Sequence, residues 1–189
     1  MSTQRALEGL CVFDIDNTLT RAKYATAEEC EVPSLRQEPS YLYGPGVYAL
    51  EAVQRCKNLG YRPVVATAAH CDRQTPRRLA FLQGLGFGED VVTAAGAAGP
   101  GLQCANPING GNKEMMVRKL MKDYDMPGER VMFFDDTKAM RHQVRRIPGV
   151  VTGIASPGCG GYYCDTACGL QKREFDDAVR RRFQSPQSK

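Results

Sequence analysis

The chain has 189 residues, of which 42% are hydrophobic and 24% are charged. These proportions are close to those of an average globular protein, so they exclude a disordered or fibrous chain. The formal net charge of +4 is too small to indicate nucleic-acid binding by itself, and the first apolar run, residues 10–13, is far shorter than a signal-peptide core or a membrane span. We therefore expect one cytoplasmic domain over residues 1–189, with no membrane partner.

The first part of the chain predicts two buried strands separated by a helix. Residues 10–13 form an uninterrupted apolar strand. The segment 20–45 fits no regular element and is either a flap-like, substrate-facing loop or an ordinary connection. Residues 47–59 carry apolar side chains at helical spacing, and Gly60 is a natural end for this helix. A second strand follows at residues 61–66.

The rest of the chain continues this alternation. Thr75 and Pro76 begin a helix that runs to about residue 85, and a short strand follows at residues 91–92. Residues 93–111 are rich in Gly, Ala, Asn and Pro and predict a surface loop. The remaining strands are expected at 131–134 and 150–154, and the remaining helices at 113–124, 138–146 and 170–183. The whole pattern predicts an α/β fold, a doubly wound, mostly parallel five-stranded sheet with helices on both faces.

The eight cysteines are expected to be reduced, because nothing in the sequence indicates secretion and cytosolic thiols are normally free. Three of them, Cys159, Cys164 and Cys168, fall in a Gly-rich loop at about residues 156–169. Three thiols in one loop are candidate zinc ligands, but the short paired spacing of zinc sites is missing. We favour a plain loop over a zinc site.

Two separate strands are each followed by a pair of acids. Asp14 and Asp16 follow the strand at 10–13, and Asp135 and Asp136 follow the strand at 131–134. The carboxyl ends of parallel strands share one edge of the sheet, which is where ligands bind. One acid at a strand end is often only a cap for the next turn, but two pairs at one edge favour a Mg²⁺ site.

Two further residues suit phosphate chemistry. The second strand ends in Thr67, whose hydroxyl is a candidate donor to a phosphate oxygen, and Lys113 begins the helix after the long loop. A cation near a transferring phosphoryl group stabilises its charge. Each residue is weak evidence by itself, and Lys119 and Lys122 lie on the same predicted helix as Lys113.

The order of these motifs, from Asp14 and Asp16 through Thr67 and Lys113 to the second acid pair, resembles the haloacid-dehalogenase superfamily of phosphatases and phosphotransferases over roughly residues 10–155. The resemblance implies a Rossmann-like fold. It also implies that Asp14 attacks phosphorus to form an aspartyl-phosphate, and that Asp16 serves first as acid and then as base. Thr67 and Lys113 would bind the phosphoryl group.

By the same resemblance, Mg²⁺ would be held by Asp14, the backbone carbonyl of Asp16 and Asp135, with Asp136 a direct or water-mediated neighbour. Thr18 would orient the loop that carries the nucleophile. The segments 20–45 and 93–111 are too short for a folded cap domain, so a capless enzyme is expected. An open site of this kind suits macromolecular phosphorylated substrates, or a homo-oligomer in which a neighbour covers the site. Tyr41 and Tyr43 are candidates to line its mouth.

Hydrolysis of a phosphomonoester is the leading hypothesis, and three alternatives stay open. The same scaffold transfers phosphoryl groups to acceptors other than water in some members of the family. A nucleic-acid-end phosphatase would use the basic residues of the last helix, although the small net charge favours an ordinary solvated face. A non-catalytic module for metal or phosphate binding is the third, and the complete set of acids argues against it.

Overall fold

The computed structural model describes residues 7–21, 44–67, 75–88, 112–154 and 168–184. Within them, four strands form one parallel sheet in the order β2-β1-β3-β4. The strands are β1 (Gly9–Phe13), β2 (Tyr61–Val65), β3 (Val131–Asp135) and β4 (Val151–Ile154). The strand expected at residues 91–92 lies outside the described residues.

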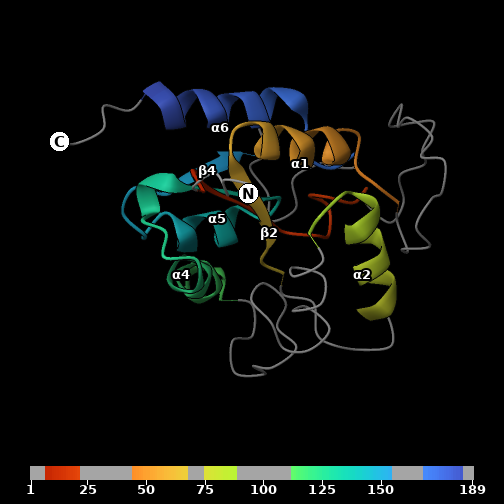
Figure 1. Ribbon diagram of the computed structural model, residues 1–189, viewed down its shortest axis with the longest axis horizontal. Coiled ribbons are helices and arrows are strands. Elements are labelled where there is room, and N and C mark those ends of the chain that lie inside the picture. Colours follow the sequence, from red (N-terminus) through yellow and green to blue (C-terminus); the bar gives the residue numbers. More distant parts are fainter. Residues whose placement is uncertain (1–6, 22–43, 68–74, 89–111, 155–167, 185–189) are drawn as a thin grey trace, which may run out of the picture.

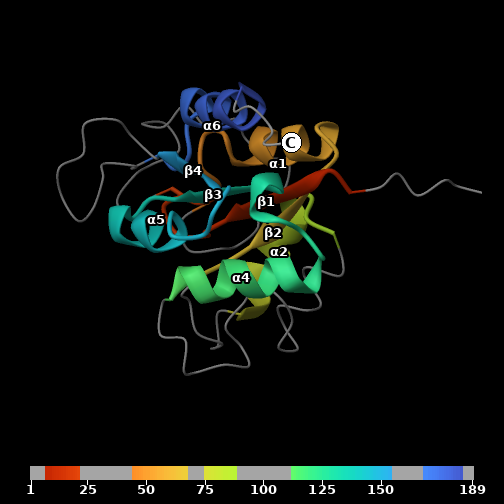
Figure 2. The same ribbon diagram turned by 90° about the vertical axis from the view of Figure 1, so that its left-hand side faces the viewer.

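Helices cover both faces of this sheet. They are α1 (Ala49–Asn58), α2 (Thr75–Gly84), α4 (Lys113–Asp123), α5 (Lys138–Val144) and α6 (Lys172–Gln184). Figure 1 shows α1 and α6 side by side on one face, and Figure 2 shows α2 and α4 on the other. The doubly wound α/β fold is therefore confirmed. No helix among the described residues combines the length and apolar character needed to cross a membrane.

The end of α1 follows the expected chemistry. Gly60 has a φ of 78°, in the left-handed region that closes helices, and its N–H donates to the Lys57 carbonyl at 2.9 Å. A Cβ atom at Gly60 would also lie 2.7 Å from the Cγ atom of Glu8. Both the backbone conformation and the space therefore require glycine at this turn.

Aromatic rings join the sheet to α6. Phe13 of β1 stacks on Phe134 of β3 with ring centroids 5.1 Å apart, and Phe134 stacks on Phe175 of α6 at 5.3 Å. The rings of Phe13 and Phe175 are fully buried. Because the two strand residues are the last ones before the acids, the stack holds the carboxyl ends of β1 and β3 together.

A disulfide also joins β1 to its covering helix, contrary to the expectation of reduced thiols. Cys11 of β1 and Cys56 of α1 are bonded, with Cα atoms 6.3 Å apart, and both side chains are fully buried. Cys168 is disulfide-bonded as well, and no described cysteine is free. Alternating side chains place Cys11 and Phe13 on the same face of β1, so the helix that packs there brings a second thiol within bonding range. A disulfide-bonded Cys168 does not supply a thiolate to zinc, whereas Cys159 and Cys164 lie outside the described residues.

Removing the Cys11–Cys56 disulfide should lower the free energy of unfolding. The bond links residues 45 positions apart, and the chain-entropy relation for such a loop gives about 4 kcal/mol. We expect this loss for Cys11→Ala/Cys56→Ala in chemical denaturation without reductant, measured beside the unmodified chain. Thiol alkylation and mass spectrometry would establish the oxidation state first, and equal unfolding free energies for an oxidised chain and the double variant would contradict the prediction.

Candidate active site

The loop after β1 is a tight turn that presents Asp14 at the sheet edge. The Asp14 N–H donates to the Phe134 carbonyl at 2.9 Å, which extends the pairing of β1 with β3 by one residue. The Ile15 carbonyl then accepts from the N–H groups of Leu19 and Thr20 at 2.9 and 3.0 Å. Asn17 has a φ of 55°, a conformation that asparagine tolerates better than most residues. The chain therefore reverses directly beyond the nucleophile candidate.

Two distant segments pack against the base of this turn. The Leu170 N–H donates to the Thr18 carbonyl at 2.9 Å, and a Cβ at Gly169 would lie 2.9 Å from the same carbonyl oxygen. The Arg21 N–H donates to the Gly44 carbonyl at 3.1 Å. Arg21 and Gly44 therefore lie next to each other, and both lie close to the loop that carries Asp14.

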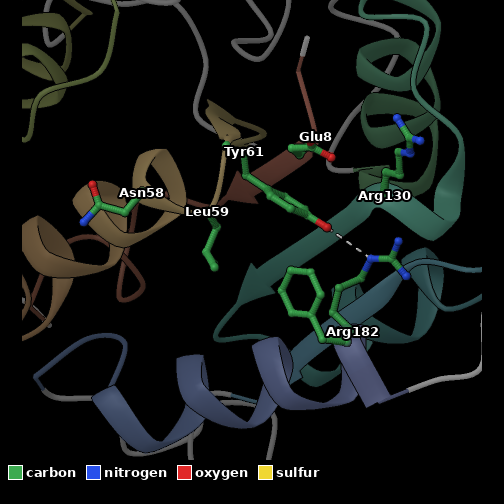
Figure 3. A pocket seen from close by; sticks show the side chains of 8 residues that line it. Glu8, Asn58, Leu59, Tyr61, Arg130 and Arg182 are labelled. Carbon is green, nitrogen blue, oxygen red and sulfur yellow. Dashed lines mark hydrogen bonds between the residues drawn. The ribbon is translucent and has the colours of Figure 1, made fainter. Parts of the chain in front are cut away.

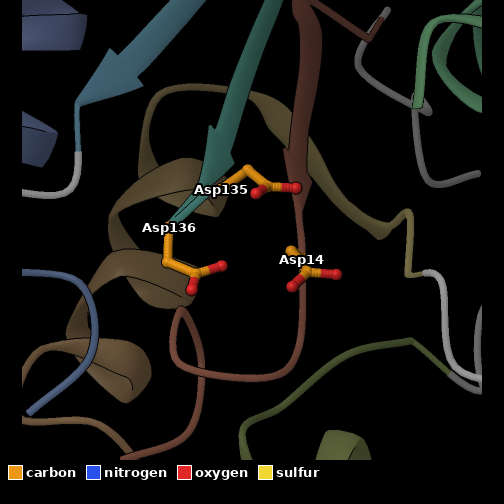
Figure 4. A group of neighbouring side chains, drawn as sticks. All are labelled: Asp14, Asp135 and Asp136. Atoms are coloured by element: carbon orange, nitrogen blue, oxygen red, sulfur yellow. The ribbon is translucent and has the colours of Figure 1, made fainter. Parts of the chain in front are cut away.

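Three carboxylates meet at the carboxyl edge of the sheet (Figure 4). One oxygen each from Asp14, Asp135 and Asp136 lies within 4.8 Å of the others, and all three residues are buried. Asp14 comes from the end of β1 and the other two from the end of β3, so the register of these neighbouring strands creates the group. Carboxylate oxygens in this number and spacing are suitable ligands for Mg²⁺.

Lys113 is buried beside these acids. Its Nζ atom lies 2.5 Å from Asp14 Oδ1 and 3.2 Å from Asp135 Oδ2, and it donates to the Ala66 carbonyl at 2.6 Å. The side chain is only 2% exposed, whereas that of Lys119 on the same helix is 59% exposed and pairs with Asp123. The structure thus brings Lys113, the lysine chosen from the order of the motifs, to the acids and leaves Lys119 exposed.

The start of α4 sets the position of Lys113. The Asn112 side chain caps the helix by accepting a hydrogen bond from the Met115 N–H at 3.1 Å. The Lys113 N–H donates to Gln143 Oε1 at 2.9 Å, which ties this end of α4 to α5. Both bonds fix the first turn of the helix, from which the lysine reaches the acids.

Burial makes Asp135 and Asp136 hard to ionise. It raises the pKa of Asp135 to about 7, and the charge of Asp14 adds to this effect. It likewise raises the pKa of Asp136 to about 6, again with a contribution from Asp14. Burial alone would lower the pKa of Lys113, but the carboxylates of Asp14 and Asp135 raise it above its ordinary value. The lysine therefore stays charged at neutral pH.

The donor set fits a divalent cation. Three carboxylates face one ammonium group, so the ionised site has excess negative charge. Asp135 Oδ2 is buried and accepts no hydrogen bond among the described residues, although Lys113 Nζ lies 3.2 Å away. A buried carboxylate oxygen of this kind is costly unless a cation compensates it. A hard cation would satisfy that oxygen and the excess charge together.

The other predicted residues lie around this centre. Thr67 is buried and directly follows Ala66, whose carbonyl binds Lys113. The Thr18 hydroxyl accepts from the Asp136 N–H at 3.1 Å, so it orients the second acid pair rather than only its own loop. Asp16 is half-buried and is not one of the three grouped carboxylates.

Several polar contacts of the acids were not expected from the sequence. Thr137 donates its N–H to Asp135 Oδ1 at 2.8 Å and its hydroxyl to Asp136 Oδ1 at 3.3 Å. Asn17 Nδ2 donates to Asp136 Oδ2 at 3.3 Å. These two residues adjoin the acid motifs, so their position in the sequence was an available signal. Arg141 and Gln143 offered no such signal because they face the site only after α5 packs.

A hollow lies at the opposite edge of the sheet, where β1, β2 and β3 begin (Figure 3). Its volume is about 420 Å³, and Arg182 Nε donates there to the Tyr61 hydroxyl at 3.2 Å. Its lining residues include Glu8, Asn58, Arg130 and Phe183. Ligands of open parallel sheets bind outside the carboxyl ends of the strands, so this hollow is not the candidate active site.

Solved structures of other proteins resemble the chain over most of its length, and two are examples. A hypothetical protein of Xanthomonas campestris has a TM-score of 0.52 and 17% identity, over 94% of this chain and 84% of its own. The cobalt-bound deoxy-D-mannose-octulosonate 8-phosphate phosphatase of Haemophilus influenzae has a TM-score of 0.51 and 14% identity, over 95% and 91%. The sequence matches no family model and no curated protein. At these identities the likeness is one of fold, and the chain has the haloacid-dehalogenase fold.

The stability of the metal-free chain should fall as the pH rises. Burial raises the pKa of Asp135 to about 7 and that of Asp136 to about 6, from 3.8 in an unfolded chain. Between pH 3.8 and the raised pKa of each acid, the folded state therefore binds more protons than the unfolded state. The stability that this protonation provides is lost as the pH rises through about 6 and then about 7. Mg²⁺ needs the ionised acids, so it should raise the melting temperature more at about pH 8 than at about pH 5.

Thermal unfolding with Mg²⁺ or with a chelator, at both pH values, would measure this difference. Asp135→Asn/Asp136→Asn is the control, because it removes both titrating groups and should flatten the dependence on pH. A Mg²⁺ effect of the same size at both pH values would contradict the assignment.

Removing the lysine should destabilise the metal-free chain. Lys113→Met leaves Asp14 and Asp135 without their buried partner, and breaking a buried pair costs about 3–5 kcal/mol. Lys119→Met is the matched control, because Lys119 lies on the exposed face of the same helix. Chemical denaturation should show the loss only for Lys113→Met, and added Mg²⁺ should reduce it. Equal stability of the two variants would exclude a compensating role for Lys113.

Proposed function

We propose that the chain is a Mg²⁺-dependent phosphatase that hydrolyses a phosphomonoester through an aspartyl-phosphate on Asp14. The observation that carries this proposal is the convergence of Asp14, Lys113 and the Asp135–Asp136 pair at the carboxyl edge of the sheet. The likeness to the Haemophilus influenzae phosphatase, which was solved with bound cobalt, supports it at the level of the fold.

Asp14 is the best placed nucleophile of the three acids. Its side chain is 11% exposed, whereas that of Asp135 is 1% exposed. One of its oxygens, Oδ1, is bound by Lys113, so the other oxygen is available for attack. The reacting carboxylate is thus held in place on one side and reachable on the other.

Mg²⁺ would be held by Asp14, Asp135 and the backbone carbonyl of Asp16, with Asp136 bound directly or through water. When bound, the ion would stabilise negative charge on the phosphoryl oxygens and keep Asp14 ionised. Lys113 would stabilise the same charge from the protein side, and Thr67 would donate to a phosphoryl oxygen. Lys113 and the bound ion together would offset the charge of the three carboxylates, so that an anionic phosphoryl group could approach Asp14.

The reaction would proceed in two steps on the side chains of the first loop. An oxygen of Asp14 forms a bond to phosphorus while the bond from phosphorus to the leaving oxygen breaks, and Asp16 gives its proton to that oxygen. Asp16, now ionised, then takes a proton from water as the water oxygen attacks phosphorus. The bond between phosphorus and Asp14 breaks, which releases inorganic phosphate and restores both acids.

We further propose a single capless domain over residues 1–189. Arg21 and Gly44 are bonded to each other near the loop that carries Asp14, and so short an insertion between them suits a flap-like loop rather than a separate cap domain. Without a cap, a macromolecular phosphorylated substrate or a covering neighbour in a homo-oligomer would complete the site. The same geometry serves transfer to an acceptor other than water.

The last helix gives little support to a nucleic-acid substrate. On α6, Lys172 pairs with Asp176 at 2.5 Å, and Arg180 and Arg181 both pair with Asp177, at 2.5 and 2.8 Å. The helix thus neutralises much of its own basic charge, as an ordinary solvated face does. The expectation of reduced cysteines followed from the expected cytoplasmic location, and the Cys11–Cys56 disulfide argues against that location because disulfides are rare in cytosolic proteins.

Hydrolysis of an aryl phosphate with and without Mg²⁺ tests the proposal. Asp14→Asn should reduce turnover about 10³-fold or more, because the amide is a poor nucleophile. Asp123→Asn, an exposed acid of α4, is the matched control and should keep full activity. Rapid acid quench and mass spectrometry of the unmodified enzyme should find phosphate on the peptide that contains Asp14.

Substantial turnover by a pure Asp14→Asn preparation would exclude Asp14 as the nucleophile. Turnover that appears only with an added alcohol, with phosphate transferred to it, would identify a phosphotransferase. Absence of turnover by the unmodified enzyme on aryl phosphates and on phosphorylated peptides would contradict the phosphatase proposal and favour a binding module.

A further inference from the structure

Arg141 of α5 is a buried cation that reaches the backbone of the acid pair. It is 5% exposed, and its Nη1 atom donates to the carbonyl oxygens of Asp135 and Asp136 at 2.7 and 2.6 Å. An arginine on a short helix usually extends into solvent. This one instead binds the two residues whose side chains face Asp14.

Each of these carbonyls belongs to a peptide group that is also held at its other end. In the peptide between Asp135 and Asp136, Arg141 binds the C=O and the Thr18 hydroxyl accepts from the N–H at 3.1 Å. In the next peptide, Arg141 binds the C=O of Asp136, and the Thr137 N–H donates to Asp135 Oδ1 at 2.8 Å. The rotation of both peptide planes is therefore restrained.

Restraint of these two planes sets the direction of the Asp136 side chain. The planes on either side of a residue define its φ and ψ, and these angles define where its Cβ atom points. Asp135 is fixed on its other side by pairing of β3 with β4. The backbone thus leaves little freedom in how either carboxylate approaches Asp14.

The buried charge of Arg141 also suits this position. Burial lowers its pKa, while the negative charges of Asp135, Asp136 and the buried Glu174 of α6 oppose that change. An arginine nevertheless remains protonated at any ordinary pH. A permanent cation behind the two carbonyls thus offsets part of the repulsion among the three acids without occupying the space between them.

We infer that Arg141 is a positioning residue that orients Asp135 and Asp136 for binding of a divalent cation. It acts from behind the site through two backbone carbonyls and makes no contact with the grouped carboxylate oxygens among the described interactions. The inference rests on the proposed function only in requiring that the three acids bind a divalent cation, and it does not depend on the substrate or on hydrolysis.

The test is the Mg²⁺ affinity of Arg141 variants, measured by isothermal titration calorimetry with the full chain and no substrate. Arg141→Gln should weaken Mg²⁺ binding about 10- to 100-fold, the range found for residues that orient metal ligands. Arg141→Lys should give an intermediate affinity, because Nζ of lysine ends one bond short of Nη1. Arg146→Gln is the matched control, because Arg146 is exposed and follows the same helix.

A double-mutant cycle separates positioning from a general loss of stability. Thr18→Val removes the acceptor at the other end of the Asp135–Asp136 peptide. Since both residues restrain one peptide group, their effects on Mg²⁺ affinity should be coupled rather than additive. Circular dichroism of each variant establishes whether it is folded. If Arg141→Gln does not fold, the cycle uses Arg141→Lys in its place.

Equal Mg²⁺ affinity for the unmodified chain and the folded Arg141 variants would overturn the inference, as would a loss of the same size in Arg146→Gln. Additive effects of Arg141→Lys and Thr18→Val would also overturn it, because two independent losses do not describe one restrained peptide. If the unmodified chain binds no Mg²⁺ or Mn²⁺, the metal site itself is refuted and the inference with it. Metal binding without hydrolysis would contradict the phosphatase proposal alone.

Discussion

The ammonium group of Lys113, buried between the carboxylates of Asp14 and Asp135, is the interaction on which the site depends. An ion pair in a protein interior repays the cost of dehydration only when its geometry is good and its remaining polar atoms are bound. Here one nitrogen contacts both carboxylates and the Ala66 carbonyl. These contacts therefore bring together the ends of three strands and the beginning of α4. The single positive charge of Lys113 is smaller than the negative charge of the three ionised acids.

The parallel sheet makes this arrangement available. In the register of β1 and β3, Phe13 lies opposite Phe134, so Asp14 and Asp135 follow as neighbours at the same edge. A shift of this register by one residue would turn alternate side chains to the other face and separate the acids. The stacked rings of Phe13, Phe134 and Phe175 oppose such a shift because they pack only when the two strands are aligned. Core packing and site geometry thus depend on the same alignment.

Elements outside the sheet restrain the residues that follow β1 and β3, which carry the acids. The turn after Asp14 is closed by bonds to the Ile15 carbonyl, and the segment around Leu170 packs on its base. The Cys11–Cys56 disulfide joins β1 to α1 three residues before the nucleophile candidate. On the other side, α5 contributes Gln143 to the start of α4 and Arg141 to the acid pair. The site therefore has rigid support on both faces of the sheet, as a catalytic group needs if it is to react without reorganising.

The amino-acid sequence alone determined the class of fold and the acids at the edge of the sheet. Apolar runs that end in Asp14 and in Asp135 are local features, and so is the helical spacing before Gly60, because each depends on residues only a few positions apart. Only the tertiary structure decided which lysine faces the acids, that Cys11 and Cys56 form a disulfide, and that Arg141 holds the carbonyls of the acid pair. These contacts join residues on separately packed elements, or depend on the angle at which a helix meets the sheet. No pattern along the chain encodes such angles, since they follow from how the whole core packs.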